Sequence, residues 1–160
     1  MAFVALLVGG IGVYALYSWH ENNNPIPSSI RTKISFVIFY SKASGNITAN
    51  KKTIKYDGST KIFSYLANYN HKRITVSEQA VPTGFIDIPA TYTKFIDSLN
   101  QYSSVGSVYG NVALTQPKGL NGQQSAVMNA DGTLLFAHPD SGNLSDDQWR
   151  EFFNSLQMIN

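Results

Sequence analysis

The sequence predicts an α+β fold, in which an N-terminal transmembrane helix is followed by a mainly antiparallel sheet with two helices packed on one face. Three observations support this prediction. Residues 2–19 contain no charged side chain and are long enough to cross a membrane. Short runs of β-branched and aromatic residues follow, some of them joined by Asp-Gly pairs that are typical of hairpins. Two later segments carry apolar residues at helical spacing.

The segment AFVALLVGGIGVYALYSW, residues 2–19, is interpreted as a transmembrane anchor. A spanning helix needs about 20 apolar residues, with about 17 as the lower limit. Tyr14, Tyr17 and Trp19 stand at its polar end, and aromatic rings prefer the headgroup layer. A cleaved signal peptide is one alternative, but YALYSWHE lacks the small residues that precede a cleavage site. A soluble core helix is the other, and it would show a polar stripe.

Residues 20–30, HENNNPIPSSI, are expected to form an extended linker, because they contain two prolines and no apolar periodicity. Residues 31–160 then form a single globular α+β domain, large enough to bury its own core without disulfides or metal. Arg31 and Lys33 would favour the cytoplasmic side, but large domains translocate largely regardless of charge. The low charged fraction of 14% favours an envelope protein. We therefore expect a single-pass membrane protein with an extracytoplasmic domain.

Strand patterns dominate the first two thirds of the domain. ISFVIFY (residues 34–40) is a run of β-branched and aromatic residues, and RITVSEQAV (residues 73–81) alternates apolar and polar side chains. SVYGNVALTQ (residues 107–116) is interpreted as a strand pair or as one strand bent at Gly110. These segments predict an antiparallel sheet.

Two hairpins are predicted more sharply. TIKYDGSTKIFSYLANY (residues 53–69) and SAVMNADGTLLFAHP (residues 125–139) each place an Asp-Gly pair between two apolar runs. Such a pair supplies the positive φ angles that tight hairpin turns require. We therefore expect tight turns at residues 57–58 and 131–132.

Two helices are predicted by apolar stripes. Residues 89–101 begin with a proline suited to a first helical turn, and residues 145–157 begin with Ser145 and Gln148 at the spacing of a capping box. The first stripe consists of Tyr92, Phe95, Ile96 and Leu99. The second stripe consists of Trp149, Phe152, Phe153 and Leu156. If both stripes cover one sheet face, Trp149 and Phe95 are buried.

The order of IPSSI, ISFVIFYS, ITVSEQAVPTGF, SVYGNVAL and SAVMNADGTLLFAHP, followed by an amphipathic helix, resembles single-span membrane-anchored envelope proteins of reduced-genome, candidate-phylum bacteria. The resemblance covers nearly all of residues 25–157, and none of its motifs is catalytic. It implies an anchored α+β domain. More remotely, the layout is similar to half-barrel envelope domains that bind lipids or lipoproteins or sense the state of the envelope, an analogy of fold that does not establish function.

Charge is distributed unevenly along the domain. Residues 31–73 hold nine basic residues and one acidic residue, whereas residues 74–160 hold three basic and eight acidic residues. The basic half is predicted to meet an anionic lipid or an envelope polymer, and nucleic acid is not expected as a partner. The alternative is that the two halves of one sheet neutralise each other. The basic candidate binding residues are Lys51, Lys52, Lys55, Lys61, Lys72 and Arg73.

Two further candidates stand at the end of a predicted strand. Glu78 and Gln79 would either receive a ligand or satisfy backbone groups of a nearby loop. The three histidines, His20, His71 and His138, lack partners at metal-ligand spacing, so no metal or cofactor is expected. The sequence HPDSG at residues 138–142 is interpreted as a turn rather than a His-Asp catalytic pair.

The sequence therefore favours a membrane-anchored, extracytoplasmic and non-catalytic binding or interaction module. One alternative is a lipid-binding, lipoprotein-binding or envelope-sensing domain with an apolar cavity between sheet and helices. A less favoured alternative is an envelope hydrolase. A hydrolase would bring Glu78, His138 or Asp140 together with another titratable group in a cleft.

Overall fold

The computed structural model describes residues 24–43, 45–116 and 122–159, so the predicted anchor at residues 2–19 lies outside the described residues. The chain divides into two units, residues 1–33 and 34–160. In the first unit, helix α2 (Ser28–Arg31) is a single turn that follows Pro27. The segment predicted as an extended linker therefore ends in a helical turn. Among the described helices, none has the length and apolar character that crossing a membrane requires.

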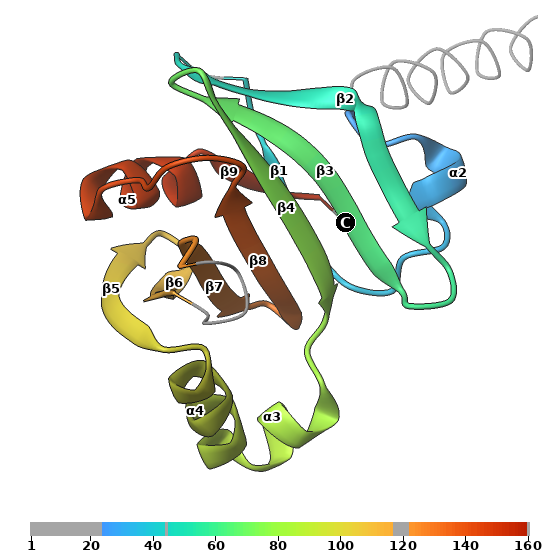
Figure 1. Ribbon diagram of the computed structural model, residues 1–160. Coiled ribbons are helices and arrows are strands. Elements are labelled where there is room, and N and C mark those ends of the chain that lie inside the picture. Colours follow the sequence, from blue (N-terminus) through green and yellow to red (C-terminus); the bar gives the residue numbers. More distant parts are fainter. Residues whose placement is uncertain (1–23, 44, 117–121, 160) are drawn as a thin grey trace, which may run out of the picture. The chain divides into compact units, whose positions relative to one another are not determined.

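The second unit is a mainly antiparallel α+β domain, which confirms this part of the predicted fold (Figure 1). A seven-stranded antiparallel sheet has the order β2-β3-β4-β8-β7-β6-β5, and β1 and β9 form a separate two-stranded sheet. The strands are β1 (Ile38–Ser41), β2 (Ile47–Asp57), β3 (Ile62–Tyr69), β4 (Lys72–Ala80), β5 (Gln101–Ser107), β6 (Gly110–Thr115), β7 (Ser125–Ala130), β8 (Thr133–Pro139) and β9 (Leu156–Ile159). The helices are α3 (Thr83–Asp87), α4 (Pro89–Ser98) and α5 (Asp146–Asn154).

The predicted hairpins form, but one turn differs from the expectation. Asp131 and Gly132 have φ angles of 47° and 78° and join β7 to β8 as a two-residue turn, as predicted. The 53–69 hairpin instead has a four-residue loop between Asp57 and Ile62, and its positive φ falls on Lys61 rather than on Gly58. Side-chain hydrogen bonds of Asp57 organise this loop, so the glycine does not need to provide the turn.

The Asp57 carboxylate should titrate far below its usual range. It accepts hydrogen bonds from the Ser59 hydroxyl at 2.6 Å and the Ser59 N–H at 2.8 Å. These bonds, the hydroxyl first, lower the pKa of Asp57 to about 2. We expect a carboxyl-detected NMR titration to give a midpoint near this value, and Ser59→Ala to raise it toward 3.8. An unchanged midpoint in Ser59→Ala would contradict this account of the loop.

The seven-stranded sheet is covered on both faces, by different helices. On the α4 face, Ile96 of α4 packs in one cluster with Ala113, Val127 and Leu134 of the sheet. On the α5 face, which is the opposite one because strand side chains alternate, Ser103 bonds to Asp146 of α5. The expectation that both helices pack on one face is therefore wrong.

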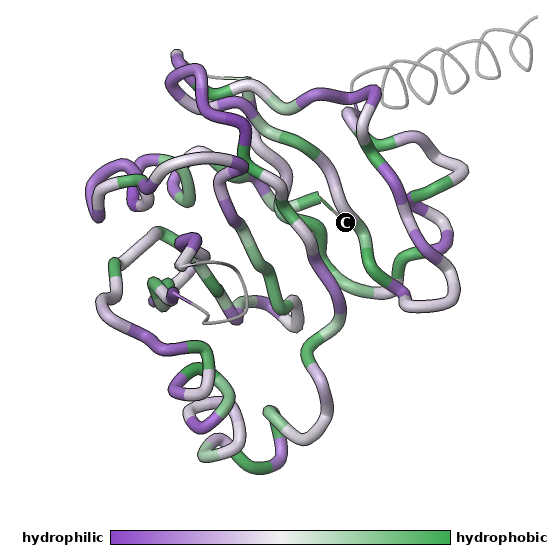
Figure 2. The backbone as a smooth tube through the Cα atoms, in the orientation of Figure 1, coloured by the Kyte–Doolittle hydropathy of each residue, from purple (hydrophilic) through white to green (hydrophobic). Residues whose placement is uncertain are grey.

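The burial pattern of the strands agrees with helices covering both faces of the sheet. In β7 and β8 almost every residue is buried, whereas buried and half-buried residues alternate along most of β3 and β4. Figure 2 shows the corresponding hydropathy along the chain. Continuous apolar runs are typical of strands covered on both faces, and alternation is typical of strands with one open face. The α4 face is consequently open over β2, β3 and β4.

Helix α5 begins at the predicted cap and packs against the sheet through buried aromatic side chains. The capping box of Ser145 and Gln148 is present, as predicted. Trp149 is 0% exposed, which confirms its predicted burial, while Phe95 on α4 is only partly buried.

A side-chain hydrogen bond also joins α5 to β3. The Tyr69 hydroxyl donates to Glu151 at 2.5 Å, and burial, then this bond, raises the pKa of Tyr69 to about 12.

The two ends of the domain pair with each other. Of the predicted strand at residues 34–40, only Ile38 to Tyr40 are extended and paired, and the partner is β9. The helix predicted to reach residue 157 ends at Asn154, after which Leu156 begins β9. Leu156 is buried as expected, but from a strand rather than from the helix.

Candidate anion-binding groove

A large irregularity in β2 shapes the open part of the α4 face. Asn50 pairs with Leu66 and Lys55 pairs with Ser64, so four residues of β2 lie opposite the single residue Tyr65. Figure 1 shows the resulting sharp bend in β2. Such a bulge re-aims side chains that a regular strand would alternate between the faces.

Within the bulge, hydrogen bonds of polar side chains take the place of the regular backbone hydrogen bonds between β2 and β3. Asn50 accepts a hydrogen bond from the Lys52 N–H at 3.1 Å, and the Thr53 hydroxyl donates to the Asn50 carbonyl at 2.7 Å. The Thr53 oxygen also accepts from the Leu66 N–H at 2.9 Å. Asn and Thr side chains compete with regular pairing in this way. These bonds hold the backbone of the bulge, on which the exposed residues Lys52 and Lys55 stand.

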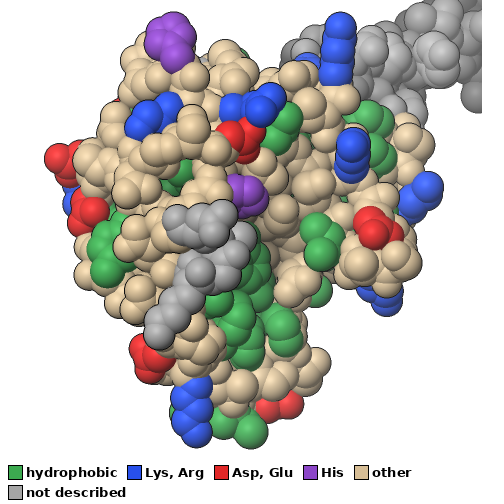
Figure 3. All heavy atoms as spheres, viewed as in Figure 1, with side chains coloured by type: hydrophobic (Ala, Val, Ile, Leu, Met, Phe, Trp, Pro, Cys, Tyr) green, Lys and Arg blue, Asp and Glu red, His purple; other side chains and the backbone are tan. Residues whose placement is uncertain are grey.

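A groove of about 340 Å³ opens beside the bulge. Two lysines and four residues with hydroxyl groups line it, and none of the described residues around it carries a carboxylate. The lining residues are Lys52, Thr53, Lys55, Ser64, Tyr65, Leu66 and Thr75. Figure 3 shows this face, with basic side chains over β2 to β4 and hydrophobic side chains gathered toward α3 and α4. The groove is called the lysine groove below.

The lysine groove keeps positive charge available. Neither Lys52 nor Lys55 forms an ion pair within the described residues, and the Ser64 hydroxyl has no hydrogen bond there. Thr75 donates to Asp140 at 3.2 Å, and Asp140 is itself neutralised by an ion pair with Arg73. The hydroxyl protons of Thr53 and Thr75 are already donated within the protein, which leaves two ammonium groups and the Ser64 hydroxyl as donors to a phosphate or carboxylate group.

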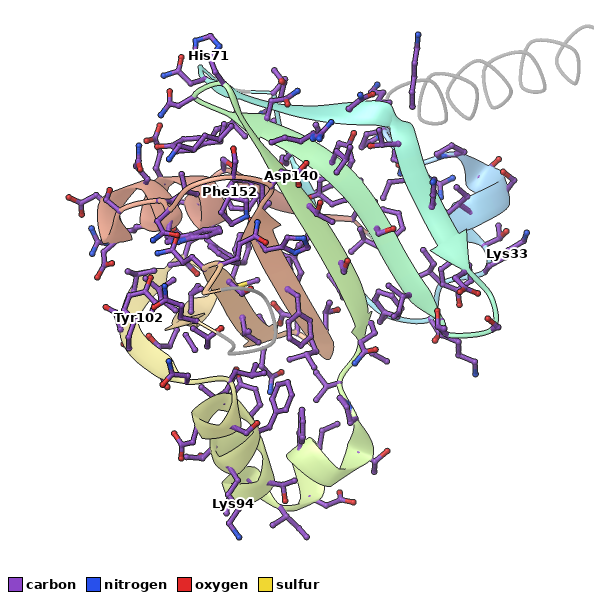
Figure 4. The ribbon with its side chains drawn as sticks, viewed as in Figure 1. Lys33, His71, Lys94, Tyr102, Asp140 and Phe152 are labelled. Carbon is purple, nitrogen blue, oxygen red and sulfur yellow. The ribbon has the colours of Figure 1, made fainter. Side chains whose placement is uncertain are left out.

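The other basic candidates lie elsewhere. The Lys72 ammonium donates to the Asn143 carbonyl at 2.5 Å, and Arg73 is paired with Asp140, which Figure 4 places beside β4. Lys51 is exposed on the bulge and Lys61 in the hairpin loop, and neither lines the groove. The structure thus brings two of the six basic candidates into one site. The composition of residues 31–73 could not single them out.

Glu78 lies on the other side of the sheet from the lysine groove. It is 1% exposed and pairs with Leu135, whereas Gln79 pairs with Leu134 and faces the α4 side. One Glu78 oxygen accepts a 2.9 Å hydrogen bond from the Phe39 N–H of β1, and the other has no partner within the described residues. Burial raises the pKa of Glu78 well above its usual range, and the Phe39 bond opposes this effect.

Tyr65 completes the attachment of β1. Its hydroxyl donates to the Phe39 carbonyl at 3.0 Å and accepts from the Ser41 N–H at 3.2 Å. Burial, then the charge of Glu78, raises the pKa of Tyr65. Because β9 is the one strand among the described residues that pairs with β1, these two side chains satisfy groups on the other edge of β1. Glu78 therefore satisfies a backbone group, as one of its two predicted alternatives proposed, but this group belongs to strand β1 and not to a nearby loop.

His138 and Asp140 form no catalytic constellation with Glu78. His138 pairs with Thr75 and faces the α4 side, so the sheet separates it from Glu78. The Asp140 N–H donates to the Arg73 carbonyl at 2.8 Å, which ties the following turn to β4. Among the described residues, no group of three or more His, Asp or Glu side chains is placed to hold a metal ion.

Comparisons with known proteins add no relative. No protein-family model matches the chain, and neither the curated proteins nor the solved structures contain a match. The resemblance to membrane-anchored envelope proteins therefore stays a prediction from sequence motifs. What the chain does has to be argued from its own geometry.

Proposed function

We propose that this protein is a non-catalytic binding module that recognises an anionic group, of the phosphate type found in lipid headgroups and envelope polymers. The observation that carries the proposal is the lysine groove, where Lys52 and Lys55 stand beside hydroxyl groups and no described residue of the lining is a carboxylate. Hydrogen bonds to charged groups are about twice as strong as neutral ones, so such a site favours an anion over a neutral ligand. The separation of Glu78 from His138 by the sheet supports binding rather than hydrolysis.

The site of action that we propose is the outer surface of the cell membrane. Residues 2–19 would anchor the chain, and residues 20–30 would keep the domain close to headgroups and wall polymer. Attraction to an anionic surface amounts to about 1 kcal/mol per basic residue and fades within a Debye length. Two lysines in one groove thus give a selective but salt-sensitive contact.

Loss of the two groove lysines should abolish anion binding. We expect the full chain, in a non-ionic detergent, to bind glycerol 3-phosphate in isothermal titration at low salt. Lys52→Gln with Lys55→Gln should weaken this binding at least tenfold, because two charge-assisted contacts disappear. The matched control is Lys42→Gln with Lys94→Gln, which removes the same charge from exposed positions outside the groove; Figure 4 shows Lys94 on α4. Equal binding by both double variants would contradict the proposal.

The anchor gives an independent prediction. The full chain should remain with the membrane fraction after carbonate and high-salt washes, because residues 2–19 are apolar all round. Removal of residues 1–19 should release it. Protease added to intact spheroplasts should digest the domain if it is extracytoplasmic. Release of the full chain by the washes, or protection of the domain, would count against the anchor or its orientation respectively.

A further inference from the structure

A second pocket lies on the α4 face, between α4 and the edge of the sheet formed by β5, β6 and β7. Its volume is about 260 Å³. Carboxamides, one hydroxyl and one tyrosine provide its polar groups, and no charged side chain lines it within the part of the chain that the structure describes. The lining residues are Tyr92, Thr93, Ile96, Gln101, Asn111, Ala113 and Asn129. It is called the amide pocket below, and its chemistry differs from that of the lysine groove.

Two asparagines form the polar centre of the amide pocket. Val112 pairs with Met128 across β6 and β7, and one further step of this register places Asn111 opposite Asn129. Directly opposed side chains in an antiparallel pair have Cβ atoms about 4.5–5.5 Å apart. Neither carboxamide forms a hydrogen bond within the part of the chain that the structure describes. Both carboxamides are exposed to solvent, and asparagine is depleted in strands, so the pair presents free hydrogen-bonding groups at this point of the sheet.

Packing of α4 explains why the asparagines stay uncovered. Ile96 lies in the cluster with Val127 and Leu134, and the Phe95 ring meets the Phe136 ring edge-on at 6.1 Å. Through these contacts α4 packs on β7 and β8. Ala113 of β6 belongs to the same cluster and has a short side chain. A depression with an apolar base and amide walls results.

Tyr92 forms the side of the amide pocket that belongs to α4. Its ring packs edge-on against Phe85 with the centroids 5.6 Å apart, so its position is fixed. Across the pocket, Gln101 uses its amide nitrogen to bond the Ser103 carbonyl at 3.1 Å, which leaves the amide oxygen as an acceptor. The pocket thus combines a fixed aromatic ring with several groups that both donate and accept hydrogen bonds.

We propose that the amide pocket binds one uncharged sugar ring. Adjacent ring hydroxyls each donate and accept a hydrogen bond, and a pair of opposed carboxamides offers the same combination of donors and acceptors. The apolar C–H face of a sugar ring suits Tyr92 and the base formed by Ile96 and Ala113. A volume slightly below that of a typical drug-sized site fits one ring better than an extended ligand. A charged ligand would find no opposite charge among the lining residues.

The test is a titration of the full chain with neutral sugars in a polyoxyethylene detergent, which carries no sugar headgroup. Glucose, galactose and N-acetylglucosamine are the probes, and side-chain amide NMR signals of Asn111 and Asn129 are the readout. At least one probe should cause saturable shifts of both signals. Asn111→Ala with Asn129→Ala should weaken binding of that probe about tenfold or more, since two hydrogen-bonding groups are lost.

Controls separate this site from the lysine groove. Asn46→Ala with Asn68→Ala removes two exposed amides outside the amide pocket and should leave sugar binding unchanged. Lys52→Gln with Lys55→Gln, and added salt, should also leave it unchanged, so failure of the anion proposal would not affect this one. The proposal is overturned if no neutral sugar gives saturable shifts, or if the Asn111/Asn129 variant binds as the natural chain does. Binding of glucose 6-phosphate alone, lost with the lysines, would overturn it too.

Discussion

Replacement of Trp149 by alanine is expected to lower the free energy of unfolding by about 3–5 kcal/mol, the range for large-to-small changes in well-packed cores. Trp149 is 0% exposed and contacts the Phe152 and Phe153 rings, each with centroids 6.0 Å away. All three rings belong to α5, which covers one face of the seven-stranded sheet. Loss of the indole therefore leaves a cavity between helix and sheet. Urea unfolding of the full chain in detergent, followed by near-ultraviolet circular dichroism, measures the change.

Two further variants refine this prediction. The Trp149 ring nitrogen is buried and has no hydrogen-bond partner within the described residues, so Trp149→Phe loses volume but also removes an unsatisfied donor. It should cost clearly less than Trp149→Ala. Arg150→Ala changes the exposed face of the same helix and should cost less than about 1 kcal/mol. A loss below about 1 kcal/mol in Trp149→Ala would show that α5 is not packed as described.

Replacement of Glu78 should reveal how β1 is held. Glu78→Leu leaves the Phe39 N–H without its partner in the interior, which should cost about 1–3 kcal/mol. Glu78→Gln keeps an oxygen acceptor at this place and should be much better tolerated. Hydrogen exchange of the Phe39 amide provides a local readout, because it should accelerate in the leucine variant and stay slow in the glutamine variant.

The same carboxyl should make stability depend on pH. Because burial raises the pKa of Glu78 in the folded protein above its ordinary value of 4.5, the folded state binds the proton more tightly than the unfolded chain. The stabilisation is complete below pH 4.5 and is lost as the pH rises through the raised folded-state pKa. Asp57 acts with the opposite sign, and only at lower pH, since its pKa is lowered to about 2.

The measurement is the free energy of unfolding of the natural chain and of Glu78→Gln between pH 4.5 and 10.0, the ordinary pKa values of Glu and Tyr. The natural chain should lose stability relative to the glutamine variant as the pH rises. Comparing the two chains removes the contribution of every ionisable group that both contain. Parallel curves would mean that Glu78 ionises without cost, which its burial does not allow.

Features specified by neighbouring residues could be predicted from the sequence. The capping box of α5 lies within four consecutive residues, and the 131–132 turn needs only an Asp-Gly pair between strands. Both were predicted and both are present. Pairing of β1 with β9 joins residues more than a hundred positions apart, and no local pattern specifies it. Leu156 continues the apolar stripe of α5 at helical spacing, so the start of β9 was hidden by that periodicity.

The face that each helix covers was the main error of the sequence-based fold. A helical stripe shows that a helix packs on something, but not on which side of a sheet. The apolar runs in SAVM and TLLFA do carry a signal, because strands covered on both faces read as continuous apolar segments. These runs belong to β7 and β8, and they indicate that helices cover both faces of that half of the sheet. The alternating pattern of β4 indicates that the other half has one open face.

The candidate sites depend on how the strands pair, and the spacing of residues along the sequence does not specify this pairing. The excess of basic residues indicated an anionic partner. Of the six basic candidate residues, Lys52 and Lys55 share one groove because of the bulge in β2, which the sequence spacing does not show. The residues that build this bulge, Asn50 and Thr53, have side chains that compete with regular strand pairing, and this was the available signal. Asn111 and Asn129 are separated by a hairpin and a segment outside the described residues, so only the sheet register brings them together.

The most direct measurement of the central claim is to locate a bound anion on the full chain. In a titration with glycerol 3-phosphate at low salt, we expect the side-chain NMR signals of Lys52 and Lys55 to shift most and to saturate together. The same signals should return toward their free positions when salt is raised, because the contact is electrostatic. Lys72, whose ammonium already bonds the Asn143 carbonyl, should shift little. Equal shifts at the exposed lysines Lys42, Lys51 and Lys94, or no saturable shift at Lys52 and Lys55, would contradict the account.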